Sequence, residues 1–367
     1  QVPIFEKSVK DLVGVQHSIA LNSATSALHV ACMALGLSKG DILWTTPVTF
    51  VASANCGLYC RAKVDFVDID PNSYNISLDA LEKKLISSKM KGKLPKVVVV
   101  VHLCGQPCDM KEIADLSKRY GFKVIEDASH AIGAKYKGEF VGNCRYSDIT
   151  VFSFHPVKII TTAEGGMALT NDKQLAQNME LYRSHGITRK PHIMTHKSDG
   201  QWYYQQVALG YNYRMTDLQA ALGVSQLKRL DDFLKKRQLL LENYEERLSN
   251  LPIITPQQKP DRHSSLHLYV IRLKLAQLKN SRRKIFDELR DDGIGVNVHY
   301  IPIHLQPFFQ KMGFKKGDFP EAERYYSEAI SIPLHHGMTS KDQEKVISSL
   351  TRILLSTWLS NTLFQFY

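Results

Sequence analysis

Between Gln16 and Leu169 the sequence alternates short apolar runs with amphipathic stretches. This alternation is typical of βαβ units, which build a mostly parallel sheet covered by helices. Several of the runs are apolar throughout, as strands covered on both faces require. The pattern predicts strands at residues 41–45, 64–69, 97–103, 123–126, 149–154 and 166–170.

Two helix starts can be read from capping patterns. Asp109 followed by Glu112 has the spacing of a capping box and would begin a helix that ends at Gly121. Thr216 with Gln219 has the same spacing and would begin a long helical stretch to about residue 248.

Beyond Pro252 the order of elements changes. The expected elements are strand 266–273, helix 281–291, strand 295–300, and helices 321–330 and 340–354. This order is typical of a small α+β domain. A length of 367 residues also suits two domains. We therefore predict an α/β protein with a large domain over residues 1–240 and a smaller C-terminal domain over residues 241–367.

One connecting segment is unusually long. Residues 186–211 are polar and aromatic with weak periodicity, and a plain connector in a compact domain is shorter than this. We expect a functional or interface loop there, with a disordered loop as the alternative.

Composition excludes several classes of protein. Apolar residues make up 44% of the chain and charged residues 23%, which is ordinary for a globular protein. No apolar stretch approaches the roughly 20 residues that cross a bilayer, and the N-terminus lacks a basic region followed by an apolar one. We therefore expect a cytoplasmic protein without a membrane partner.

Charge and cysteine usage point to no nucleic-acid or metal partner. The net charge is +11, but the basic clusters lack interleaved aromatic residues, so it suits solubility or an anionic small substrate better than nucleic acid. Cys56/Cys60 and Cys104/Cys108 have a spacing that differs from common zinc and redox motifs. Buried, reduced thiols are the favoured interpretation.

Ligands of open α/β sheets bind at the carboxyl ends of the strands, and three such ends carry suggestive residues. The first is residues 22–27, where small hydroxyl residues begin a helix. Its free backbone N–H groups would suit a phosphate. Simple N-capping by Ser23 or Thr25 is the alternative.

The second strand end is Glu126-Asp127, after an apolar run. A carboxylate there could pair with a protonated ring nitrogen, and His130 could contact the same ligand. A solvated aspartate or helix cap and a structural histidine are the alternatives. A metal pair formed by Asp127 and His130 has little support, because no third ligand is spaced near them.

The third strand end leads through a proline-containing turn to Lys158. Aromatic walls would partly desolvate this lysine, lower its pKa and favour the neutral, nucleophilic amine. An ordinary surface lysine is the alternative. With a phosphate nest, a carboxylate and Phe50 available to cover a ring, the set fits pyridoxal phosphate; Phe50 taken alone is better read as a core aromatic.

Longer motifs carry a family resemblance over nearly the whole chain. They are Asn22-Ser-Ala-Thr-Ser-Ala-Leu28, Pro47-Val-Thr-Phe-Val-Ala-Ser-Ala-Asn55, Gly105-Gln-Pro107, Glu126-Asp-Ala-Ser-His-Ala-Ile-Gly133, Ser153-Phe-His-Pro-Val-Lys158 and Gly165-Gly166. In this order they resemble the DegT/StrS-type sugar-nucleotide aminotransferases, which are fold-type-I pyridoxal-phosphate enzymes. The resemblance implies that fold, with the mostly parallel sheet in the large domain.

The resemblance also implies roles for single residues. Lys158 looks like the lysine that binds the cofactor and moves the proton, Asp127 like the partner of the ring nitrogen, and His130 like a contact on the ring-hydroxyl side. The remaining cofactor residues would be a stacking aromatic, Phe50, and the phosphate ligands Ala24, Thr25, Ser153 and Asn212. Asn212 would come from a partner subunit, which implies a homodimer with shared active sites.

Within the family, three segments resemble the members of the pseudaminic-acid pathway. They are residues 153–166, Arg183-Ser-His-Gly186 and Val298-His-Tyr-Ile-Pro302. This resemblance implies transfer of an amino group from glutamate to the keto carbon, C4, of a UDP-linked 4-keto-6-deoxy-N-acetylhexosamine. Family members generally carry a further N-terminal segment on the substrate side, which is absent before the helix around Phe5.

Four other functions were weighed. Another nucleotide keto sugar as acceptor and a non-catalytic regulatory protein on the same scaffold stay open. A sugar dehydratase of the same fold carries histidine in place of the lysine, so Lys158 disfavours it. A nicotinamide dehydrogenase is disfavoured because no Gly-x-Gly-x-x-Gly follows the first strand.

Overall fold

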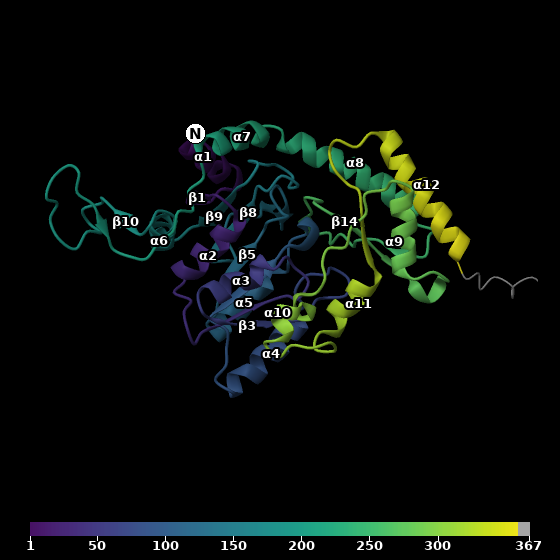
Figure 1. Cartoon of the computed structure of the whole chain (residues 1–367), viewed down its shortest axis with the longest axis horizontal. Helices are drawn as coiled ribbons and strands as arrows, with labels where there is room; N and C mark the ends of the chain where they lie inside the picture. The colour runs from purple at the N-terminus through teal and green to yellow at the C-terminus, as the bar shows by residue number, and fades with distance from the viewer. Residues whose placement is uncertain (359–367) are drawn as a thin grey trace, which may run out of the picture.

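The alternating apolar runs form a seven-stranded sheet with the order β1-β9-β8-β5-β4-β2-β3 in this computed structural model, which describes residues 1–358 (Figure 1). β9 runs antiparallel to both of its neighbours, and the other six strands are parallel. Their carboxyl ends therefore meet at one edge. The strands are β1 (His17–Leu21), β2 (Ile42–Thr45), β3 (Lys63–Phe66), β4 (Val97–Val101), β5 (Lys123–Asp127), β8 (Ile149–Ser153) and β9 (Gly166–Thr170).

Helices cover both faces of this sheet. In β4, five consecutive valines, Val97 and Val99 pack in one apolar cluster with α2 and α3. Val98 and Val100 pack in another cluster with α4 and α5 on the opposite face. This explains why the strand is apolar throughout. The helices around the sheet are α1 (Val2–Val13), α2 (Ala24–Ala34), α3 (Ala52–Tyr59), α4 (Leu78–Met90), α5 (Met110–Tyr120), α6 (Lys173–Arg183) and α7 (Asp217–Leu227).

A second apolar cluster lies around a three-stranded antiparallel sheet of β12 (Ile253–Ile254), β14 (Tyr269–Leu273) and β15 (Ala329–Ile332). α8 (Leu230–Leu248) joins the two parts, because Phe233 packs with α1 while Leu240 packs in the second cluster. The predicted boundary after residue 240 falls inside this helix. The division into two domains stays a prediction, and residues 359–367 lie outside the described part. The other helices here are α9 (Arg282–Asp291), α10 (Pro307–Gln310), α11 (Pro320–Glu328) and α12 (Ser340–Thr357).

The predicted strand over residues 295–300 is wrong. Only Asn297 forms an isolated bridge, to Ser331, within the described structure. The third strand of the small sheet is instead β15, whose first residues the sequence analysis assigned to the end of a helix. Ile330 and Ile332 are both buried there, and an apolar run this short fits a helix end or a strand equally well by periodicity.

The two capping predictions had different outcomes. Thr216 and Gln219 form the expected capping box, although the helix breaks after Leu227 into α7 and α8. Asp109 makes no side-chain cap at the start of α5. Its carboxylate instead accepts hydrogen bonds from Lys259 Nζ at 2.9 Å and Arg262 Nη2 at 2.8 Å, because two cations outcompete a backbone N–H for it.

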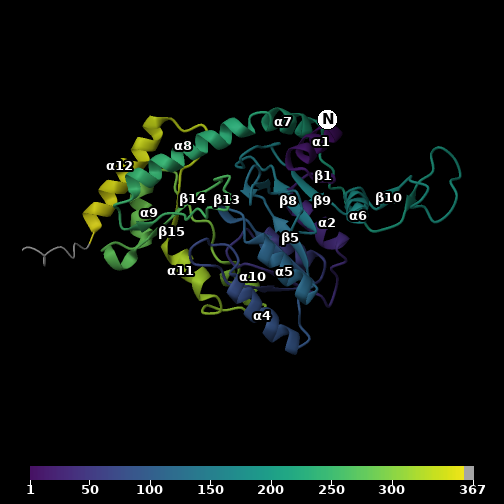
Figure 2. The ribbon, with the colours of Figure 1, turned by 180° about the vertical axis from the view of Figure 1, so that it is seen from behind.

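The long segment over residues 186–211 forms a hairpin of β10 (Ile187–Thr188) and β11 (Gln205–Gln206). Both ribbon views show its loop and α12 at opposite ends of the molecule (Figures 1 and 2). Trp202 and Tyr204 are exposed on it. Its role as a functional or interface loop stays a prediction. A third small sheet pairs β13 (Arg262–His263), β6 (Lys135–Tyr136) and β7 (Glu139–Phe140).

The expected thiols and membrane character can be compared with the structure. Cys56 and Cys108 are buried, Cys60 and Cys104 are half-buried, and all four are unpaired in the described residues. Among the helices of residues 1–358, none is both long and apolar enough to cross a membrane.

Candidate active site

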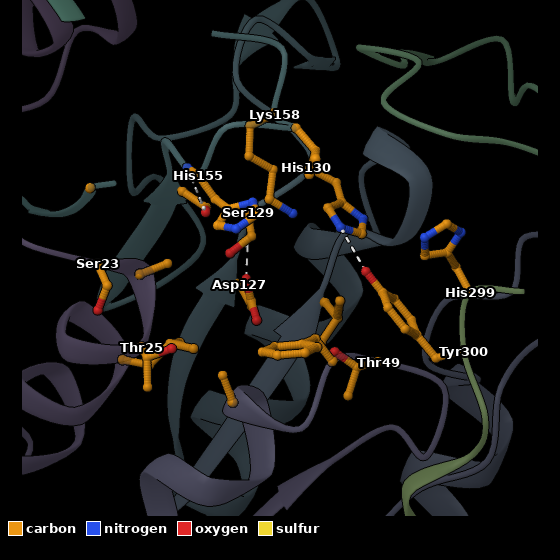
Figure 3. A pocket seen from close by; sticks show the side chains of 18 of the residues that line it. Ser23, Thr25, Thr49, Asp127, Ser129, His130, His155, Lys158, His299 and Tyr300 are labelled. Carbon is orange, nitrogen blue, oxygen red and sulfur yellow. Dashed lines mark hydrogen bonds between the residues drawn. The ribbon is translucent and has the colours of Figure 1, made fainter. Parts of the chain in front are cut away.

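A cavity of about 330 Å³ lies at the carboxyl ends of the parallel strands (Figure 3). Its walls come from the segments that follow β1, β2, β5 and β8, from the segment that precedes β9, and from residues 299–300. The predicted site residues that line it are Ala24, Thr25, Phe50, Asp127, His130, Ser153 and Lys158. Further lining residues are Ser23, Leu28, Thr49, Ala52, Val101, Ser129, His155, Val157, Glu164, Gly165, His299 and Tyr300.

Lys158 lies on the loop between β8 and β9. The turn that presents it is closed by its backbone N–H, which donates to the carbonyl of His155 at 2.9 Å. Burial lowers the pKa of the Lys158 amine to about 8, and the negative charge of Asp127 opposes part of this shift. A large fraction of the amine is therefore neutral near pH 8, as a nucleophile or base requires.

Asp127 is the last residue of β5 and is 5% exposed. Its Oδ2 accepts a hydrogen bond from Ser53 Oγ at 2.6 Å, and its Oδ1 accepts one from the backbone N–H of Ser129 at 3.1 Å. Both Asp127 and Lys158 point into the cavity (Figure 3). Among residues 1–358 no cluster of histidine, cysteine and acidic side chains is suited to a metal.

His130 is held as a neutral imidazole. Burial lowers its pKa well below the ordinary value, and the charge of Lys158 adds to this effect. Its Nδ1 accepts from the backbone N–H of Cys104 at 3.3 Å, so Nε2 is assigned the proton. Nε2 lies 3.3 Å from the hydroxyl of Tyr300. His130 can therefore donate to Tyr300, which leaves the hydroxyl hydrogen of Tyr300 available to a ligand.

The start of α2 combines the two readings of residues 22–27. Ser23 is the N-cap, and its Oγ accepts from the backbone N–H of Ser26 at 3.1 Å. The N–H groups of Ala24 and Thr25 belong to the first turn and have no intrahelical acceptor. A Cβ on Gly166 would lie 2.4 Å from the Ala24 nitrogen, so glycine allows β9 to begin directly against this helix end.

Phe50 is not a core residue. Its side chain is 58% exposed, and its ring lies 6.3 Å from the ring of Tyr300 across the cavity. Two aromatic rings therefore flank the space above Asp127 and Lys158 (Figure 3).

His299 and Tyr300 were assigned no site role from the sequence, although their motif was noted. His299 Nδ1 lies 2.8 Å from Ser331 Oγ, and Tyr325 donates to the His299 carbonyl at 2.6 Å. Burial lowers the pKa of His299 to about 4, with a further contribution from the charge of Lys158. These contacts are long-range, so only the aromatic and imidazole residues of the motif itself could have indicated them.

Asn212 does not line the cavity of its own chain. It is exposed, and its backbone forms an isolated bridge with Ser184. Its predicted role as a ligand across a subunit interface stays a prediction.

Comparison with known proteins agrees with this site. The model of the DegT/DnrJ/EryC1/StrS aminotransferase family matches residues 1–351. The UDP-4-amino-4,6-dideoxy-N-acetyl-beta-L-altrosamine transaminase of Campylobacter jejuni is 40% identical over 355 residues, which cover 96% of this chain and 90% of that protein.

Solved structures share the fold over almost the full length. Helicobacter pylori PseC, an aminotransferase involved in the biosynthesis of pseudoaminic acid, superposes with a TM-score of 0.87 at 31% identity, covering 97% of this chain and 91% of that one. A Streptococcus pneumoniae protein in its PLP form superposes with a TM-score of 0.85 at 27% identity, covering 97% and 91%. The chain therefore belongs to the DegT/DnrJ/EryC1/StrS aminotransferase family, whose enzymes depend on pyridoxal phosphate.

Proposed function

We propose that the protein transfers the amino group of glutamate to C4 of a nucleotide-linked keto-deoxy sugar, UDP-4-keto-6-deoxy-N-acetylhexosamine, in the cytoplasm. The observation that carries the catalytic part is the pair of Lys158 and Asp127, which face one cavity from neighbouring strands. The names of the Campylobacter and Helicobacter relatives support the choice of acceptor.

The cavity has the features that pyridoxal phosphate needs. The Ala24 and Thr25 N–H groups, with the hydroxyl of Ser153, would hold the phosphate at the positive end of α2. Asp127 would hold the ring nitrogen, because a carboxylate has about four acceptor positions and two protein donors leave room for a third. Phe50 would cover one ring face. A volume of about 330 Å³ lies within the usual range for small-ligand sites.

When bound, the cofactor supplies an electron-withdrawing ring that stabilises negative charge on the carbon from which a proton is lost. Lys158 Nζ would take the proton from the α-carbon of glutamate and later deliver one to the sugar carbon. Its lowered pKa suits both steps, because the group exchanges protons readily near pH 8. Asp127 would keep a proton on the ring nitrogen.

His130 and Tyr300 would contribute donors without adding charge. The neutral His130 would orient Tyr300 and lie on the ring-hydroxyl side. Burial raises the pKa of Tyr300 above its ordinary value, so this hydroxyl keeps its hydrogen and can donate it. With Phe50, Tyr300 would also limit the access of water to the reacting atoms.

The active unit in this proposal is a homodimer with shared sites. Asn212 is exposed and outside the cavity of its own chain, so its side chain is available to the phosphate of a second chain. A two-fold arrangement would make this exchange reciprocal and give two equivalent composite sites.

Incubation with glutamate and a panel of nucleotide keto sugars tests the function. Mass spectrometry should show an amino sugar and an equal amount of 2-oxoglutarate with the UDP-linked 4-keto sugar, and neither with the Lys158→Ala variant. Faster conversion of a differently linked sugar would correct the acceptor. The absence of both 2-oxoglutarate and amino sugar across the panel would instead favour the regulatory alternative.

A further inference from the structure

Two buried hydroxyl groups lie in line behind the Asp127 carboxylate. Ser53, in the first turn of α3, is fully buried, and its Oγ lies 2.6 Å from Asp127 Oδ2. Thr49, on the segment before α3, is 3% exposed, and its Oγ1 lies 2.8 Å from Ser53 Oγ. The three groups form one hydrogen-bonded chain that leads from α3 to the cavity.

The direction of the hydrogens in this chain follows from chemistry. An ionised carboxylate only accepts hydrogen bonds, so the single hydroxyl hydrogen of Ser53 must go to Asp127. Ser53 then has no hydrogen for Thr49 and must accept one from it. The chain therefore runs from Thr49 to Ser53 to Asp127, and each bond polarises the next.

This chain fixes the carboxylate from the side opposite to Ser129. The Ser129 N–H binds Oδ1 while Ser53 binds Oδ2, so rotation of the carboxylate breaks both contacts. Ser53 does not line the cavity. It cannot act on a ligand directly and can influence one only through Asp127.

We propose that Ser53, supported by Thr49, is a positioning residue that holds the Asp127 carboxylate ionised and aimed at the ring nitrogen of the cofactor. This inference rests on the proposed function, because it takes Asp127 to bind that nitrogen. A purely structural pair of hydroxyls would stabilise the fold and leave the strength of cofactor binding unchanged.

Binding of pyridoxamine 5′-phosphate to the apoprotein tests the proposal. This probe has no aldehyde, so its affinity is independent of a covalent bond to Lys158, and fluorescence titration gives its Kd. Ser53→Ala should raise the Kd about tenfold, in line with the loss of one hydrogen bond to a charged group. In an Asp127→Ala background the same change should alter the Kd by less than about twofold, because Ser53 then has nothing to position.

Thr49 offers a matched pair of variants. Thr49→Val keeps the shape but removes the hydroxyl, and it should raise the Kd about threefold, whereas Thr49→Ser keeps the hydroxyl and should restore the wild-type value. Since Thr49 also lines the cavity, the valine variant is repeated in the Ser53→Ala background. There it should have no effect if Thr49 acts through Ser53.

Each outcome decides the matter. Equal losses with and without Asp127, together with a lower melting temperature of the apoprotein, would overturn the positioning role in favour of a structural one. If Ser53→Ala does not fold, the Thr49 pair gives the answer. Failure of the wild-type protein to bind the probe would reject the proposed function itself, whereas wild-type affinity in all Ser53 and Thr49 variants would reject this inference alone.

Discussion

Glu126 and Asp127 are adjacent carboxylates on β5, and each is 5% exposed. Successive side chains of a strand point to opposite faces, so the two meet different surroundings. Glu126 Oε2 lies 2.7 Å from His102 Nε2, and its Oε1 accepts from the hydroxyls of Ser147 and Thr150. Asp127 faces the cavity, with two hydrogen bonds from the protein.

The difference shows that burial alone does not mark a functional carboxylate. Burial pushes the pKa of Glu126 upward, but the bond to His102 and the hydroxyl donors outweigh it and leave the pKa below its ordinary value. The protein alone thus satisfies Glu126, which is a structural group. Asp127 keeps acceptor capacity that is open to a ligand. The predictions below separate the cavity side of β5 from its opposite side.

The largest expected effect is on the cavity side, at Lys158. Lys158→Ala should lower turnover by about 10²–10⁴-fold or more, because it removes the group that moves the proton. The apoprotein should fold normally, since the half-buried amine forms no ion pair in the described structure. Steady-state assays and thermal unfolding check both statements, and a variant with wild-type turnover would end the proposal.

The next effect contrasts the two carboxylates directly. Asp127→Ala should lower turnover about 10²-fold, because the ring nitrogen loses its charged partner, while some cofactor stays bound. Turnover normalised to bound cofactor is the relevant measurement. Unchanged turnover would remove Asp127 from the mechanism and erase the contrast with Glu126.

On the opposite side, Glu126→Gln should act on stability. The neutral amide offers one acceptor where His102, Ser147 and Thr150 need several, which predicts a loss of about 1–3 kcal/mol in the free energy of unfolding. Turnover per folded molecule should change little. Chemical denaturation and an assay of the folded fraction measure the two quantities, and a stable protein with lost turnover would place Glu126 in the site.

A third effect concerns the part of the site that the cavity of one chain lacks. Mixed dimers of a Lys158→Ala chain with an Asn212→Ala chain should contain one site with both defects and one with none. Activity should therefore rise above that of either mutant homodimer, to as much as about half of the wild-type value per dimer. Purified mixed dimers without recovery would show that Asn212 does not serve the partner's site.

The smallest effect is a shift in pH dependence. The neutral fraction of Lys158 increases as the pH rises through about 8, so covalent capture of pyridoxal phosphate by the apoprotein should accelerate over that interval. Asp127→Asn removes an anion that favours the charged amine, and the midpoint should move to lower pH. Capture rates from stopped-flow absorbance test the sign, and a shift to higher pH would contradict it.

Local patterns predicted the sheet and most of the cavity floor, because they depend on neighbours in sequence. The apolar runs gave the strands, and the residues after β1, β5 and β8 meet because parallel strands end at one edge. His299, Tyr300 and Ser53 could not be placed in this way. Their contacts with Ser331, His130 and Asp127 join distant segments. The failed cap at Asp109 has the same cause, since its competing cations lie about 150 residues away.

The most direct test of the central claim is to locate the cofactor. Holoenzyme is treated with borohydride, which makes the bond between the cofactor and its lysine permanent, and the digested protein is mapped by mass spectrometry. The account predicts that the added mass of the reduced cofactor lies on the peptide containing Lys158 and on no other lysine. A modified lysine elsewhere, with Lys158 unmodified, would contradict it.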